Sequence, residues 1–168
     1  MYKRQVLGSI NNNSGSNGGY GDFTSIATDL EQGNAYNFTL TPGYAGTAYS
    51  EYWKIWIDFN NDNDFDDSGE EVFDAGSTSS TAVSGTLTIP TSATLGQTRM
   101  RIVMKYTDSS DADLPATCGS YAYGETEDYT VNITEAAPTC NGTSGLSSSN
   151  ITENAASLSW NAVSGASY

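Results

Sequence analysis

The chain has 168 residues, with 20 acidic and 6 basic side chains, a net charge of −14 and no histidine. The absence of histidine excludes the Ser-His-Asp and Cys-His forms of nucleophilic catalysis and every zinc site that needs an imidazole ligand. The negative charge argues against nucleic acid as a partner, because binding a phosphate backbone depends on basic side chains. We also expect no membrane insertion, since no apolar run approaches the roughly 18 residues of a membrane span.

Small polar residues dominate the composition, and charged residues make up only 15% of the chain. With 37% hydrophobic and 11% aromatic residues, the chain has enough apolar material for a modest core. Together these features are typical of secreted bacterial β-proteins. We therefore expect a secreted or cell-surface location.

Apolar and polar residues alternate in several segments, and no segment sustains a helical period over ten residues. Turn residues separate these segments at intervals typical of an antiparallel sandwich. The predicted strands are 35–40, 52–59, 83–89, 100–106 and 129–133, with shorter candidates at 6–10 and 71–73. The pattern predicts an all-β fold, an antiparallel, jelly-roll-like β-sandwich.

We expect this sandwich to occupy residues 1–134 and to be followed by a short linker at 135–139, which ends on Ala-Ala-Pro-Thr. Residues 140–168 contain Leu158 and Trp160 in an alternating run that resembles the first strands of a fibronectin type III domain. This resemblance implies a partial second β domain. The alternative is an irregular tail that packs back on the first domain.

The two cysteines, Cys118 and Cys140, lie on either side of the predicted linker. They pair with each other in an oxidising compartment, or each has a partner outside this chain. The sequence leaves both options open.

Residues 58–71 carry the densest group of oxygen-bearing side chains, which recur at every second position from 58 to 66. Calcium takes six to eight oxygen ligands, and a divalent cation would relieve the repulsion among carboxylates this close together. The spacing resembles the start of an EF-hand loop, but no helical pattern flanks it. The predicted Ca²⁺ ligands are Asp58, Asn60, Asp62, Asp64 and Glu70. The alternative is a turn rich in Asn and Asp that holds no metal.

A second acidic motif, Gly-Glu-Thr-Glu-Asp-Tyr, occupies residues 124–129. Together with segments 51–60, 69–73 and 99–106, it resembles the GEVED domain, which is named for a Gly-Glu-Val-Glu-Asp run. The resemblance extends from about residue 5 to residue 134, and Thr126 stands where the family has valine. It implies a non-catalytic β-sandwich of secreted, multidomain bacterial proteins. It also implies that Cys118 pairs with a cysteine upstream of the first strand.

The acidic motif precedes the last predicted strand, and three of the chain's six cations lie in the segment 99–106. Opposite charges on neighbouring strands pair across a sheet. The predicted structural ion pairs involve Arg99, Arg101, Glu125, Glu127 and Asp128. The alternative is that Glu127 or Asp128 contributes to the metal site.

Several aromatic residues occupy Gly-rich loops or the strand positions that alternate with the apolar, inward-facing ones. Flat, exposed aromatic side chains next to Asn and Asp are suited to stacking against sugar rings. The candidate ligand-binding residues are Tyr44, Tyr49, Tyr52, Trp56, Tyr121 and Tyr123. They indicate carbohydrate or matrix-polymer binding, whereas the alternative is a spacer with no ligand.

The acidic residues also offer carboxylates for a glycosidase pair. A metal loop accounts for the same residues more economically, so we expect no enzyme. The sequence predicts a calcium-stabilised accessory module that acts in adhesion or domain spacing. Its expected partners are neighbouring domains of the same polypeptide and an extracellular polysaccharide or matrix protein, and the oligomeric state stays open.

Overall fold

The computed structural model describes residues 2–108, 113–119, 121–137 and 144–161. The chain divides into two compact units, Met1–Ala136 and Ala137–Tyr168. The described residues form strands, turns and loops, and none of them lies in a helix that could cross a membrane.

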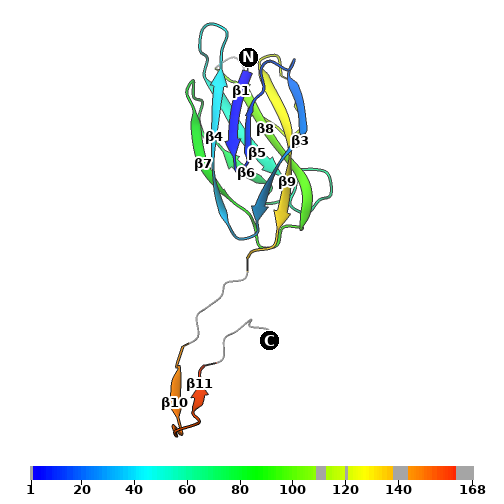
Figure 1. The fold of residues 1–168 in the computed structure, drawn as a ribbon. Coiled ribbons are helices and arrows are strands. Elements are labelled where there is room, and N and C mark those ends of the chain that lie inside the picture. The colour runs from blue at the N-terminus through cyan, green and yellow to red at the C-terminus, as the bar shows by residue number, and fades with distance from the viewer. Residues whose placement is uncertain (1, 109–112, 120, 138–143, 162–168) are drawn as a thin grey trace. The chain divides into compact units, whose positions relative to one another are not determined.

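Two sheets lie against each other in the first unit (Figure 1). The four-stranded sheet has the order β2 (Ile10–Asn13), β1 (Tyr2–Leu7), β4 (Ala35–Gly43) and β7 (Val83–Thr88). The five-stranded sheet has the order β3 (Tyr20–Glu31), β9 (Gly124–Thr134), β8 (Gly96–Tyr106), β5 (Glu51–Ile57) and β6 (Glu71–Asp74). Neighbouring strands are antiparallel except β3 and β9, which run parallel. The predicted all-β sandwich is confirmed.

The interior of the sandwich follows the predicted alternation along β5. Trp53, Ile55 and Ile57 are buried against apolar residues of the opposite sheet, such as Phe38 and Leu40 on β4. Burial of side chains of this size stabilises the folded state by roughly 2 kcal/mol each. This core fixes the position of the loops that leave the ends of β5 and β8.

The alternation failed to reveal β3, because this strand contains a bulge. Its pairing with β9 shifts between Phe23 and Ala27, so the buried side chains change parity partway along the strand. The single short strand predicted at 6–10 is also wrong. A turn at Gly8 and Ser9 separates β1 from β2 there, and Gly8 has a φ of 55°.

The second unit contains a hairpin of β10 (Ser147–Ser149) and β11 (Ser157–Ser159) among its described residues. Leu158 and Trp160 are exposed. An isolated two-stranded hairpin is at best marginally stable in water. This hairpin therefore lacks, within its described residues, the sheet that would bury its apolar side chains.

Candidate functional site

The acidic loop, residues 58–70, connects β5 to β6 at one end of the five-stranded sheet. Asp58 lies at the base of this loop and is buried. Its carboxylate accepts hydrogen bonds from the backbone N–H groups of Asn61 at 2.6 Å, Asn63 at 3.0 Å and Asp62 at 3.3 Å. Asp58 thus fixes the backbone of the loop from within.

Glu70, at the other end of the acidic loop, is also buried. Its carboxylate accepts from the backbone N–H groups of Phe59 at 2.8 Å and Asp67 at 3.4 Å. Burial raises the pKa of Glu70, whereas these hydrogen bonds act in the opposite direction. Glu70 therefore joins the two ends of the loop.

Three exposed carboxylates converge on the outer side of the acidic loop. One oxygen each from Asp62, Asp64 and Asp67 lies within 4.8 Å of the others. The side-chain amide of Asn60 donates to Asp62 at 2.8 Å and to Asp67 at 2.5 Å. The hydrogen bond from Asn60 and the backbone N–H of Asp64 hold the pKa of Asp62 below its ordinary value. We call Asp62, Asp64 and Asp67 the carboxylate cluster.

The structure divides the five predicted metal ligands into two groups. Asp62 and Asp64 lie in the carboxylate cluster and Asn60 contacts it, whereas Asp58 and Glu70 bind backbone N–H groups. The cluster also includes Asp67, which sequence analysis missed because it lies outside the alternation at even-numbered positions. The cluster offers the hard oxygen donors that Ca²⁺ prefers.

Phe65 attaches the acidic loop to the outer face of the five-stranded sheet. Its ring packs with Trp56 of β5 and Val103 of β8 in a small second core. The guanidinium of Arg101 lies 5.2 Å from the centre of the ring, within the range of a cation–π interaction. Sequence analysis missed this role, because Phe65 lies among acidic residues rather than in an alternating strand.

The second acidic motif forms the start of β9, where alternate side chains face opposite sides of the sheet. Asp128 faces outward and accepts from Nε and Nη2 of Arg101, both at 2.7 Å. It also lies 3.9 Å from Nε of Arg99 and accepts from the hydroxyl of Tyr20 at 3.0 Å. Arg99 and Arg101 thus share one carboxylate, Asp128.

Glu125 and Glu127 do not pair with these arginines, because they lie on the inner face of β9. Nζ of Lys3 on β1 is 3.8 Å from Oε2 of Glu127 and donates to the main-chain oxygen of Glu125 at 3.1 Å. The side chains of Gln5 and Tyr129 also contact Glu127. Burial lowers the pKa of Lys3 and raises the pKa of Glu125. Sequence analysis missed Lys3, which is 124 residues away from Glu127.

Neither Glu127 nor Asp128 belongs to the carboxylate cluster. Both are buried and engaged by other side chains, Glu127 by Lys3 and Asp128 by Arg101. The described geometry therefore supports a structural role for both residues.

The acidic loop and the β9 motif both lie within the segment of the chain that matches a known protein family. Residues 52–132 match the model of the GEVED domain family. This GEVED segment extends from β5 into β9, and the match confirms the resemblance over that part of the chain. No curated protein matches the chain.

The candidate aromatic residues fall into two groups. Tyr52 and Trp56 are buried and present no free face to a ligand. Tyr49 is 51% exposed and Tyr123 is 68% exposed, and the ring of Tyr106 lies between them at centroid distances of 5.6 and 6.5 Å. We call Tyr49, Tyr106 and Tyr123 the tyrosine row.

Two other predicted tyrosines make hydrogen bonds that orient nearby loops. The hydroxyl of Tyr44 donates to the main-chain oxygen of Tyr49 at 2.5 Å. Tyr121 packs on the outer face of the sheet beside Val103, and its hydroxyl bonds to the backbone of Ala116. A hollow of about 380 Å³ lies beside Tyr121 and Tyr123 and reaches the Gly-rich segment at 16–19.

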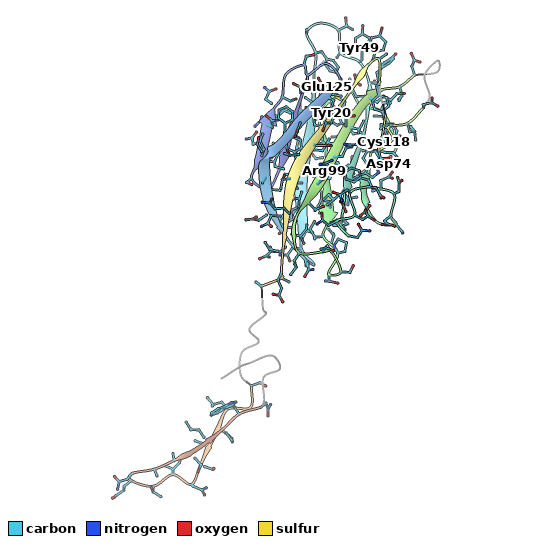
Figure 2. All side chains as sticks on the ribbon, turned by 90° about the vertical axis from the view of Figure 1, so that its right-hand side faces the viewer. Tyr20, Tyr49, Asp74, Arg99, Cys118 and Glu125 are labelled. Carbon is cyan, nitrogen blue, oxygen red and sulfur yellow. The ribbon has the colours of Figure 1, made fainter. Side chains whose placement is uncertain are left out.

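Cys118 is exposed and forms no disulfide with any described residue. Cys140 lies outside the described residues, as does part of the predicted linker. Figure 2 labels Cys118 on the same side of the first unit as Arg99.

Proposed function

We propose that this chain is a non-catalytic accessory module of a secreted bacterial multidomain protein, and that it is stabilised by a calcium ion at the acidic loop. The observation that carries the calcium proposal is the convergence of Asp62, Asp64 and Asp67 within 4.8 Å. The family match of the GEVED segment supports the assignment as an accessory domain.

The acidic loop has the features that a cation site requires. Three like charges in one place repel one another, and a divalent cation converts this repulsion into attraction. Asp58, Glu70 and Phe65 hold the loop from its inner side through backbone hydrogen bonds and apolar packing. This support lowers the ordering that the cation must impose, and it leaves the exposed outer side of the loop, residues 60–64, for the cation to restrain.

The buried state of the other carboxylates supports a non-catalytic role. A glycosidase needs two carboxyl groups that converge on a substrate cleft. Glu125 and Glu127 instead lie between the two sheets, where Lys3 contacts them. We propose that the module holds neighbouring domains of the polypeptide in place, with the cation resisting the opening of the loop.

The experiment is thermal melting of the full chain with Ca²⁺, with Mg²⁺ and with EDTA. Ca²⁺ at about 100 times its Kd stabilises the folded state by about 2.7 kcal/mol, which raises Tm by several degrees. Asp64→Asn should reduce this rise, whereas the matched control Asp66→Asn, outside the carboxylate cluster, should retain it. Identical melting curves in Ca²⁺ and EDTA would refute the calcium site.

A second candidate function is the binding of a polysaccharide or matrix polymer at the tyrosine row. The observation that favours it is the exposure of Tyr49 and Tyr123, of which Tyr123 lines the hollow at 16–19 and 121–125. The test is retention on insoluble polysaccharides and on collagen. The double variant Tyr49→Ala/Tyr123→Ala should lose retention, and Leu95→Ala, which removes another exposed apolar side chain, should keep it.

A further inference from the structure

A second hollow, of about 230 Å³, lies between the acidic loop and the outer face of the five-stranded sheet. Its lining comes from four separate parts of the chain. The lining includes Asn61 and Asn63 of the loop, Gln97 and Arg99 of β8, Thr24 of β3 and Thr130 of β9. We call this hollow the loop pocket.

The acidic loop divides its side chains between two sides. Asp62 and Asp64 contribute to the carboxylate cluster, whereas Asn61 and Asn63, which alternate with them along the chain, line the loop pocket. Asn61 and Asn63 have φ values of 63° and 77°, a backbone conformation that asparagine tolerates better than most residues. One short segment therefore forms the cluster on one side and a wall of the pocket on the other.

Three side chains of the loop pocket make no hydrogen bond to the described part of the chain. Among the residues that the structure describes, the side-chain amides of Asn61, Asn63 and Gln97 have no hydrogen-bond partner. The side chain of Arg99 is 52% exposed, Nε lies 3.9 Å from Asp128, and the guanidinium also interacts electrostatically with Asp22. Three amides and one guanidinium thus surround a single hollow.

The chemistry of these groups selects a class of ligand. A side-chain amide donates and accepts hydrogen bonds, as does a hydroxyl group, so several amides around one hollow match a ring that bears several hydroxyls. An anionic ligand is disfavoured, because Asp58 lines the pocket, Asp128 lies beside Arg99, and the chain carries a net charge of −14. A neutral sugar fits both conditions.

We infer that the loop pocket binds one ring of a neutral sugar, and that calcium at the carboxylate cluster strengthens this binding. The coupling rests on the proposed calcium site, because a cation held by Asp62 and Asp64 restrains the backbone of Asn61 and Asn63. A restrained wall loses less conformational entropy when the sugar binds. The coupling is reciprocal, so the sugar also tightens calcium binding by the same factor.

The test is a titration of the ¹⁵N-labelled full chain, followed by NMR, with methyl glucoside, methyl galactoside, methyl mannoside and N-acetylglucosamine. At least one sugar should produce saturable shifts in the side-chain amide signals of Asn61, Asn63 and Gln97, with a Kd in the millimolar range. Replacing Ca²⁺ with EDTA should weaken this Kd by about fivefold or more. If none of the four sugars shifts these signals, the inference is wrong.

Variants separate the loop pocket from the other proposed sites. Gln97→Ala should weaken sugar binding at least fivefold while the melting temperature stays close to that of the parent chain, because this exposed side chain makes no hydrogen bond to any described residue. Tyr49→Ala/Tyr123→Ala should leave the shifts at Asn61 and Asn63 unchanged. Shifts confined to Tyr49 and Tyr123 would overturn the loop pocket and support the second candidate function.

The calcium proposal and the sugar inference fail in distinguishable ways. If the melting temperature is independent of calcium but the sugar still shifts Asn61 and Asn63, the calcium site is refuted and the sugar site is supported. If the sugar Kd is the same in Ca²⁺ and EDTA while calcium raises the melting temperature, the coupling between the two sites is refuted.

Discussion

Arg101 and Asp128 are direct partners in the register of β8 and β9, and the guanidinium donates to both carboxylate oxygens at 2.7 Å. A third bond, from Nη1 of Arg101 to the main-chain oxygen of Thr117 at 2.5 Å, ties the following loop to the same side chain. Asp128 is fully buried. This pair joins the acidic run of β9 to the covered outer face of the five-stranded sheet.

Removing one member of this pair leaves the other charge without its partner in a buried position. Asp128→Ala should therefore lower the free energy of unfolding by about 3 kcal/mol. Chemical denaturation measures this difference. Asp29→Ala on β3 removes an exposed carboxylate that accepts one surface hydrogen bond, from Asn132, and should change the value by less than about 0.5 kcal/mol. Equal stabilities of the two variants would show that the pair contributes nothing net.

The attachment of the acidic loop depends on Phe65. Phe65→Ala deletes a ring that packs on Trp56 and Val103, and should destabilise the first unit by about 3 kcal/mol. We also expect weaker calcium binding, because the loop loses its apolar contact with the sheet. Denaturation and isothermal titration with Ca²⁺ measure the two effects. Leu95→Ala, at an exposed site, is the control, and unchanged calcium affinity in Phe65→Ala would contradict the proposed attachment.

The buried Glu51 predicts a specific dependence of stability on pH. Burial raises its pKa to about 7 from 4.5, and neither carboxylate oxygen has a hydrogen-bond partner among the described residues. Between pH 4.5 and 7 the folded state retains a proton that the unfolded chain releases, so the free energy of unfolding falls as pH rises through this window. Below pH 4.5 this loss is absent.

Glu51→Gln removes the titrating carboxyl group. The free energy of unfolding should therefore fall by about 1–3 kcal/mol less between pH 4.5 and 7 than it does in the parent chain. Part of the decline should remain, because burial also raises the pKa of Glu125. Melting temperatures measured at intervals across this range test the prediction. Glu135→Gln removes a carboxylate from an exposed position and is the matched control. A Glu51→Gln profile parallel to that of the parent chain would contradict the prediction.

Gly85 on β7 allows a close approach of the Phe38 ring on β4. A Cβ atom at position 85 would lie 2.6 Å from Cζ of Phe38 and 3.4 Å from Cε2 of Phe73. Gly85→Ala should therefore force Phe38 to move and lower the free energy of unfolding by about 1–3 kcal/mol. Gly46→Ala has no atom within 4 Å of the added carbon and should be nearly neutral in the same denaturation experiment.

Much of the five-stranded sheet could be predicted because alternation is a local property of the chain. The period of two placed Trp53, Ile55 and Ile57 on one face of β5, and the structure buries them together. The same reasoning treated Trp56 as exposed on the opposite face. That face is covered by Phe65 and Tyr121, from segments that alternation on β5 does not describe.

For the acidic residues too, the sequence predicted one part of the structure, and the tertiary fold decided the other part. Their spacing within 58–70 predicted an oxygen-rich loop, because Asn and Asp side chains bond to backbone N–H groups a few residues away. The inclusion of Asp67 in the carboxylate cluster depends on how the loop folds back on itself. Likewise, the charges of Glu127 and Asp128 were evident, but their partners Lys3 and Arg101 depend on which strands meet.

The sequence alone determined the β class of this protein, the faces of its regular strands and the position of its oxygen-rich loop, because each follows from residues close together in the chain. The tertiary structure decided the bulge in β3, the burial of Trp56 and the pairing of Lys3 with Glu127. Each of these depends on contacts between distant segments, and a local pattern contains no information about which segment covers a given face.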